Sequence, residues 1–174
     1  ALMADGSTDG RGPYGKEVRR GLDFLLNLVE AKPPDSRWHE GSFAYPHDTT
    51  SRMHGQGYAT LTRATALGTA SRERYRRIWT VLQKAVACCE FAQTQTGGFG
   101  YTPRKPAEHD GSVTVTVAQG PRAARDAGLV VDENVIRDGL NYLRKSQKDD
   151  GSFMYSLRQD QLRTQAGHEF TYTI

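Results

Sequence analysis

Apolar residues recur with a helical period in three stretches of the chain. In residues 132–147 they stand at Val135, Ile136, Leu140 and Leu143, a spacing that places them on one face of a helix. The same stripe is formed in residues 71–93 by Ile78, Leu82, Val86 and Cys89, and in residues 16–30 by Val18, Leu22, Leu25, Leu26 and Val29. The pattern therefore predicts three amphipathic helices.

The predicted stripe helices belong to an internal repeat. Residues 139–155 align without a gap on residues 85–101, with a small residue, a Gln, a Gly, a Phe and a Tyr in register. The matched pairs are Gln93 and Gln147, Gly97 and Gly151, Phe99 and Phe153, and Tyr101 and Tyr155. A third copy is split between residues 21–25 and 41–45. Self-similarity at a period of about 20–50 residues indicates stacked helical units, each ending in a glycine turn and a buried aromatic pair.

A second helix is expected after each turn, over residues 49–68 and 112–128, with a third starting near Glu169. In residues 113–117 Val and Thr alternate, and all five residues are β-branched, which alone would indicate a strand. A proline such as Pro121 in a helix interior costs about 3 kcal/mol. The repeat nevertheless requires a helix there, kinked near Pro121. We expect one domain over residues 1–174, with repeats 14–69, 71–128 and 132–174. Residues 1–4 are interpreted as the last turn of a helix, and the chain as a fragment of a longer array.

Composition narrows the function classes. With 37% hydrophobic and 25% charged residues the chain is typical of a globular protein. A net charge of +3 gives no support for nucleic-acid binding, and the arginine-rich residues 72–77 are interpreted as a solvated helix face. No apolar run has the length of a membrane span. Cys88 and Cys89 point about 100° apart on a helix and are not expected to form a disulfide; they favour a reducing, cytoplasmic compartment.

The repeated phrase, small–x–x–aromatic–Leu–x–x–x–Gln–x–x–x–Gly–x–aromatic, resembles the QW motif of the squalene and oxidosqualene cyclases. It is also similar to the repeats of protein prenyltransferase β subunits. Phe43, Phe99 and Phe153 stand where the cyclase motif prefers Trp, and the first copy lacks the Gln. The resemblance implies an all-α fold, an α/α toroid of outer and inner helices around an apolar cavity. This chain would supply about half of the barrel.

The catalytic motifs of these families are not carried over. The Asp-x-Asp-Asp and Asp-Cys-Thr-Ala-Glu runs of the cyclases are absent. Of the three prenyltransferase zinc positions, Asp110 matches the acid, but Ser112 replaces the thiolate and Tyr172 the histidine. Neutral Ser and Tyr are poor zinc ligands. No cofactor is therefore assigned.

Three histidine–carboxylate pairs stand at or just before the predicted inner helices: His47-Asp48, His109-Asp110 and His168-Glu169. On one rim of a toroid they could bind a divalent metal or act as general acid and base. If the protein is an enzyme, Asp110 and Glu169 are the candidate acids, with His109 and His168 beside them and Asp48 and His47 as a further pair. The alternative is that the acids only cap helices. His54 could face the cavity or be structural.

Two functions are compatible with these patterns. The first is a cyclase-like or prenyltransferase-like domain that holds an apolar, isoprenoid-type small molecule. The second is a non-catalytic repeat scaffold that binds a protein or a glycan. The first requires aromatic or aliphatic side chains towards the cavity, whereas the second tolerates polar residues such as Thr114, Thr116 and Gln119.

Overall fold

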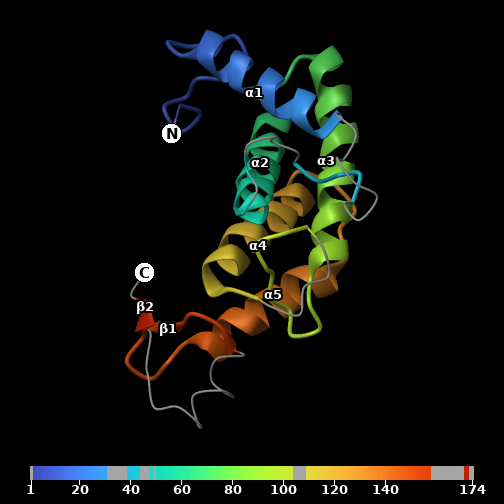
Figure 1. Cartoon of the computed structure of the whole chain (residues 1–174). Helices are drawn as coiled ribbons and strands as arrows, with labels where there is room; N and C mark the ends of the chain where they lie inside the picture. Colours follow the sequence, from blue (N-terminus) through green and yellow to red (C-terminus); the bar gives the residue numbers. More distant parts are fainter. Residues whose placement is uncertain are drawn as a thin grey trace.

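The computed structural model describes residues 2–30, 39–43, 48, 50–103, 109–157 and 171–172. Within these ranges it is helical apart from one short strand pair (Figure 1). The elements are α1 (Gly15–Glu30), α2 (Arg52–Leu67), α3 (Arg72–Ala92), α4 (Gly111–Asp126), α5 (Glu133–Ser146), β1 (Phe153–Met154) and β2 (Thr171–Tyr172). The all-α prediction and the positions of the five helices are confirmed. The helix starts at Ser71 and Asp132 are also confirmed, because both side chains accept from main-chain N–H groups of the first turn.

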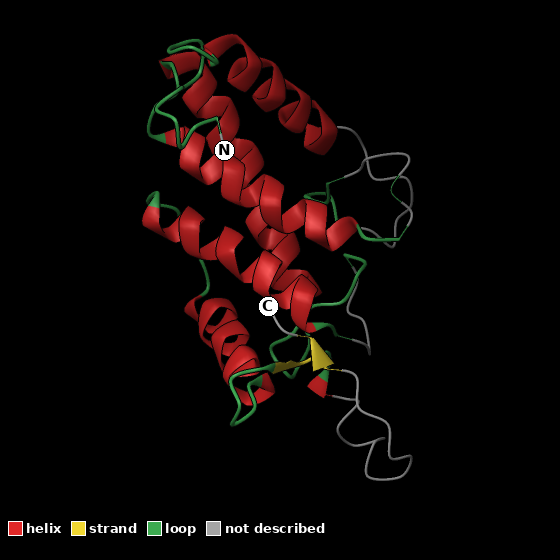
Figure 2. Ribbon diagram, turned by 90° about the vertical axis from the view of Figure 1, so that its left-hand side faces the viewer, coloured by secondary structure: helices red, strands yellow, loops and turns green. Residues whose placement is uncertain are grey.

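The helices with even numbers, α2 and α4, pack on each other, and the helices with odd numbers pack around them. The most extensive helix–helix contact joins α2 to α4, which lie side by side in the middle of the molecule (Figure 1). α3 packs against both of them, α1 packs against α3, and α5 packs against α4. The two strands lie at the end of the molecule that is nearest α5 (Figure 1), and they are the yellow arrows in Figure 2. No helix of the described part has the combination of length and apolar composition needed to cross a membrane.

The predicted stripes supply most of the core. Ile78, Leu82 and Val86 of α3 pack with Leu22 and Leu26 of α1 in the larger apolar cluster. A smaller cluster joins α2, α3, α4 and α5 through Met53, Cys89, Phe99, Val113, Val117 and Val135. One stripe position is wrong, because Leu140 is 37% exposed. Gly139 and Tyr142 are buried in that part of α5 instead.

Small residues allow α2 and α4 to approach closely. A Cβ added to Gly57 of α2 would lie 2.6 Å from the main-chain oxygen of Thr116. On the facing helix, a Cβ added to Gly120 would lie 2.9 Å from the Thr60 Cβ. Since non-bonded carbon atoms rest about 3.5–4.0 Å apart, both positions require glycine. The two helices therefore meet backbone to backbone.

The β-branched residues 113–117 lie in a helix, as the repeat predicted. Asp110 caps α4, and the Thr114 and Thr116 hydroxyls donate to the carbonyls of Asp110 and Ser112 one turn earlier. Val113 and Val117 are one turn apart and both reach the smaller cluster. The helix continues through Pro121, which is buried. Burial against α2 thus outweighs local β-propensity and the cost of the proline.

The turns that follow α3 and α5 are equivalent, and glycine is required in both. The helices end at Gln93 and Gln147, and the chain then turns at Gly97 and Gly151, whose φ angles are +87° and +86°. Side chains avoid these positive angles. The glycines therefore shape the turn after the helix and do not end the helix itself. Of the repeat aromatics that the structure describes, only Phe99 is fully buried, while Tyr101 is exposed.

Two predictions at the chain ends are wrong. Within residues 2–6 the backbone forms a turn, not the last turn of a helix. A helix was expected from Glu169, but Thr171–Tyr172 forms β2, which pairs antiparallel with Phe153–Met154. Residues 171–174 are β-branched or aromatic, and such residues favour a strand. The main-chain N–H and C=O groups of Phe153–Met154 provide the partner strand. His47, His168, Glu169 and Tyr45 lie outside the described residues.

Candidate functional site

The N-terminal ends of α2 and α4 lie at the same end of the helical layer. His54 Nε2 of α2 is 3.2 Å from Ser112 Oγ of α4. Each helix start also donates to the carbonyl of a repeat tyrosine: Met53 N to Tyr101 O at 3.0 Å, and Gly111 N to Tyr155 O at 2.8 Å. The repeat tyrosines therefore anchor the helix starts through their main chain. Their hydroxyl groups remain available for a second set of contacts.

Asp110 is the centre of a hydrogen-bond network at this end. Its Oδ1 accepts from Ser112 N at 2.7 Å, Ser112 Oγ at 2.6 Å and Val113 N at 3.2 Å. Its Oδ2 accepts from the Tyr101 hydroxyl at 2.8 Å, and the Tyr101 and Tyr155 hydroxyls are 2.6 Å apart. Both carboxylate oxygens are thus engaged, and the side chain is a helix cap with two tyrosines attached.

The network fixes the charge of Asp110. Burial raises the pKa of its carboxyl group, but hydrogen bonds from Ser112, Tyr155, Tyr101 and the Val113 N–H outweigh that effect and hold the pKa below its ordinary value. The carboxyl group is therefore ionised at neutral pH. Burial, and then the hydrogen bond to this carboxylate, raise the pKa of Tyr155. Asp110 is consequently an anionic hydrogen-bond acceptor, and Tyr155 is a neutral donor.

The direction of the bonds also fixes the tautomer of His54. Ser112 has one hydroxyl proton and gives it to Asp110, so its oxygen must accept from His54 Nε2–H. His54 Nδ1 then accepts from the Ser51 hydroxyl at 2.6 Å. In a Ser–His–Asp triad the serine proton goes to the histidine. Here it goes to the carboxylate, so Ser112 is not activated as a nucleophile.

The hydrogen bonds of His109 Nδ1 and of the Asp110 carboxylate go to different partners. His109 is buried and its Nδ1 lies 2.9 Å from the Tyr142 hydroxyl and 3.3 Å from Ser156 Oγ. Its ring also meets the Tyr142 ring edge to face, with centroids 5.1 Å apart. Asp110 has an extended backbone, and successive side chains of an extended chain point to opposite sides. His109 therefore packs towards α5, and Asp110 is linked to His54 through Ser112 instead.

Asp48 lies three residues before Ser51, the N-cap of α2, so it is not the cap of that helix. Its Oδ1 accepts from Ser51 N at 2.8 Å and Thr50 N at 3.2 Å, just before α2. No group of three or more His, Cys, Asp or Glu side chains able to hold a metal ion occurs among the described residues. Because His47, His168 and Glu169 lie outside those residues, the metal site formed by the three predicted pairs stays a prediction.

An open face extends from this network along α2 and α4. Solvent-accessible residues recur at helical spacing on α2 at His54, Tyr58, Leu61, Thr62 and Thr65, and on α4 at Ser112, Val115, Gln119, Arg122 and Asp126. Tyr58 is the most exposed large side chain of α2, at 57%. At the far end a hollow of about 380 Å³ lies between the C-terminal parts of both helices and Tyr75 of α3. The helical period of residues 54–65 is a signal in the sequence that could have revealed this face.

Thr114 and Thr116 do not belong to this face. Both are buried, and their hydroxyl groups are used within α4. Among the polar residues expected there, only Gln119 is exposed. The polar character of the face therefore comes from other residues, chiefly Thr62, Thr65 and Arg122.

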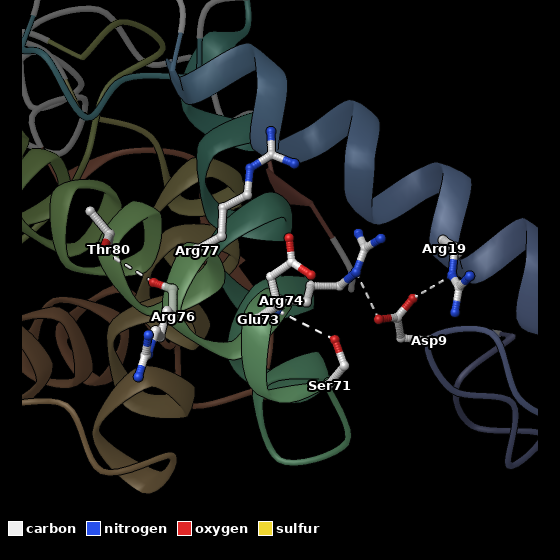
Figure 3. A pocket seen from close by; sticks show the side chains of 8 residues that line it. All are labelled: Asp9, Arg19, Ser71, Glu73, Arg74, Arg76, Arg77 and Thr80. Atoms are coloured by element: carbon white, nitrogen blue, oxygen red, sulfur yellow. Dashed lines mark hydrogen bonds and ion pairs between the residues drawn. The ribbon is translucent and has the colours of Figure 1, made fainter.

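A second hollow, of about 610 Å³, lies between the N-terminal turn, α1 and α3 (Figure 3). Asp9 is almost fully buried there and accepts from Arg19 Nε at 3.1 Å and Arg74 Nε at 2.7 Å. Arg74 also pairs with Asp23 of α1. Arg19 and Arg74 point at Asp9, whereas Arg76 and Arg77 point elsewhere. The arginines therefore tie α1 to α3 and do not converge on one ligand position.

Comparison with known proteins adds no family to these observations. A scan against protein-family models gives no match, and neither the search of curated proteins nor that of solved structures finds one. The function must therefore be argued from the residues and geometry described above.

Proposed function

We propose that this chain is part of an α/α-toroid-type repeat array and serves as a scaffold that binds a protein partner on the open face of α2 and α4. The alternating helix order supports the toroid: α2 and α4 pack on each other as inner helices do, with α1, α3 and α5 outside them. The shared glycine turns after α3 and α5 support a repeat array. Repeat proteins commonly bind partners on the extended surface that their stacked units form.

The observation that carries the binding role is the composition of the open face. Tyr58 stands out on α2 with Thr62 one turn further, and α4 presents Gln119 and Arg122. Tyr and Arg are enriched among the residues that dominate binding energy in protein interfaces. The face combines such side chains with hydroxyl and amide groups that can orient a partner through hydrogen bonds. This mixture suits a polypeptide.

The competing proposal, an isoprenoid-type ligand held in an apolar cavity, has less support. Small-molecule pockets are lined predominantly by hydrophobic and aromatic side chains, whereas Leu61 and Val115 are the only aliphatic side chains of leucine or valine size on the described open face. Cyclisation chemistry also requires an acid that can give up a proton. Asp110 is ionised and its oxygens are occupied, so the described rim does not provide that acid.

The test is a selection for peptide ligands. A random peptide library is displayed and selected on the wild-type chain, and the affinity of selected peptides is measured by fluorescence polarisation. Replacement of Tyr58 with Ala should weaken binding by about tenfold or more, equivalent to about 1.4 kcal/mol. Tyr14→Ala is the matched control, since Tyr14 is also an exposed tyrosine but precedes α1, away from this face.

Two further binding assays distinguish a protein partner from a glycan and from an isoprenoid ligand. A glycan array and a dansyl-labelled isoprenoid alcohol are presented to the same three proteins. Peptides that bind wild type and Tyr14→Ala but not Tyr58→Ala support the scaffold proposal. Isoprenoid binding that disappears in Tyr58→Ala, with no selected peptide, would replace it with the apolar-ligand proposal, and glycan binding with the same dependence would replace the protein partner with a glycan.

A further inference from the structure

The hollow at the far end of the open face has an apolar floor. Its volume is about 380 Å³, and it lies between α2, α3 and α4. Ala64 and Leu67 of α2 are buried there, and Ala123 and Ala127 of α4 are half-buried. Polar side chains are found among its exposed lining residues instead. The hollow can therefore take up an aliphatic chain while polar groups at its edge hold the end of that chain.

Two oxygen atoms at this edge have room for a further hydrogen bond. The Thr65 hydroxyl gives its one proton to Leu61 O at 2.9 Å, so its oxygen remains an acceptor. Asp126 Oδ1 accepts from Arg125 Nη2 at 3.1 Å. Its Oδ2 makes a 4.0 Å ion pair with Arg122 Nε and accepts no hydrogen bond within the described structure. The edge therefore presents acceptors to a ligand.

The surroundings of these oxygens favour a positive charge. α2 ends at Leu67 and α4 at Asp126, so the C-terminal ends of both helices, which carry partial negative charge, lie at the hollow. Among the described residues that line it, Asp126 is the only one with a charged side chain. Tyr75 is 40% exposed and stacks one ring face on Trp79, with centroids 5.8 Å apart. The opposite face can contact a cation.

The arginines beside Asp126 do not close the site. Arg122 and Arg125 reach the carboxylate from α4 itself, and their side chains are 61% and 42% exposed. Exposed ion pairs of this kind contribute little net stability, because water screens them and two long side chains must be held in one geometry. A cation of the ligand can therefore share the carboxylate with them.

We infer that the hollow binds a lysine side chain of the protein partner, an inference that rests on the proposed role of the open face. The aliphatic stem packs on the alanine floor, and the ammonium group donates to Asp126 Oδ2 and Thr65 Oγ1 beside the Tyr75 ring. Lysine fits better than arginine. The ammonium group is a compact set of three donors, whereas the guanidinium fork pairs with both carboxylate oxygens, and Arg125 already uses Oδ1.

The position of the lysine in the partner follows from the helix geometry. Tyr58 and Thr65 are seven residues apart in α2, which is about 10 Å along the helix axis. An extended peptide covers that distance in about three residues. The lysine should therefore stand about three positions from the peptide residue that contacts Tyr58.

Peptides selected on the wild-type chain test the inference by fluorescence polarisation. Lysine should recur in them at one position. Its replacement with norleucine keeps the aliphatic stem, removes the ammonium group and should weaken binding by about tenfold. Asp126→Asn should weaken binding of the lysine peptide by about threefold and leave that of the norleucine peptide unchanged, because only the ammonium group uses the carboxylate.

Asp138→Asn is the matched control. Asp138 of α5 also pairs with the arginine that precedes it, at 3.1 Å, but does not line the hollow, so this variant should bind both peptides like wild type. Circular dichroism verifies that both variants are folded. The inference is overturned if the selected peptides have no recurrent lysine, if norleucine binds equally well, or if Asp126→Asn weakens both peptides equally. Any of these results, with binding that is still lost in Tyr58→Ala, would remove the lysine site and leave the proposed partner face intact.

Discussion

The side-chain amide of Gln93 donates to the main-chain carbonyl of Val135 at 2.9 Å, across 42 positions of sequence. Gln93 is the C-cap of α3, and Val135 lies in the first turn of α5. The same nitrogen also donates to Gly97 O within its own turn. One repeat residue therefore fixes both the turn that follows its helix and the helix that comes after it.

Loss of this amide should destabilise the chain. Gln93→Ala removes two hydrogen bonds, each of which contributes about 1 kcal/mol net, so the free energy of unfolding should fall by about 1–2 kcal/mol. Urea denaturation followed by circular dichroism measures the change. Gln119→Ala is the control, because this exposed glutamine bonds only to Val115 O of its own helix in the described structure. Equal decreases in the free energy of unfolding of the two variants would contradict the role of Gln93 in joining α3 to α5.

The crossing of α2 and α4 should not tolerate one added methyl group. In Gly57→Ala the new Cβ would stand 2.6 Å from Thr116 O, which forces the helices apart. Overpacking of this kind costs about 1–3 kcal/mol. Gly68→Ala makes the same chemical change at the end of α2, where the space is open and φ is −68°. That control should be neutral or slightly stabilising, and thermal unfolding of both variants gives the comparison.

The stabilisation from Asp110 should depend on pH in a defined direction. Its folded-state pKa is depressed, so the ionised form stabilises the fold above the unfolded pKa, about 3.9. This contribution is lost as pH falls through the lower folded-state pKa. Asp110→Asn should therefore cost about 1 kcal/mol or more at neutral pH, and the gap to wild type should narrow as the pH falls below about 3.9.

Urea titrations at pH 7 and pH 3 measure that gap. Asp132→Asn is the comparison, since Asp132 caps α5 at an exposed position and accepts only from Asn134 N among the described contacts. At neutral pH, Asp132→Asn should lower the free energy of unfolding by less than Asp110→Asn does. An Asp110 effect that stays constant between the two pH values would mean that the carboxylate charge does not contribute.

The sequence was sufficient for the helices but not for the chemistry of the rim. Stripe periodicity located α1, α3 and α5, because this signal is local. The repeat also outweighed the β-branched alternation of residues 113–117, whose burial comes from the packing of α4 on α2. The pairing of His109 with Asp110 could not be judged from adjacency, because the extended backbone separates neighbouring side chains. The contact of His54 with Ser112 spans 58 positions and depends on how α2 and α4 pack.

The buried guanidinium of Arg63 gives the last prediction. Arg63 is 0% exposed in α2, donates through Nη2 to Leu25 O at 2.6 Å, and has no hydrogen-bond partner for Nε or Nη1 among the described residues. Its charge lies 5.8 Å from the centre of the Phe43 ring, a weak compensation. Burial lowers the pKa of Arg63 to about 10. The charge is therefore poorly compensated.

Replacement of Arg63 with Met keeps much of the side-chain volume and removes that charge, so the free energy of unfolding should rise by about 1 kcal/mol or more. Arg63→Ala, which leaves a cavity, should instead lower it. Because the unfolded state binds the proton more tightly, wild type gains stability as pH rises above 10, and its deficit relative to Arg63→Met should narrow there. Urea denaturation at pH 7 and pH 10.5 measures the stability gain of Arg63→Met and its narrowing at high pH. A Met variant as unstable as the Ala variant would show that the guanidinium is held by a counter-charge that compensates its burial.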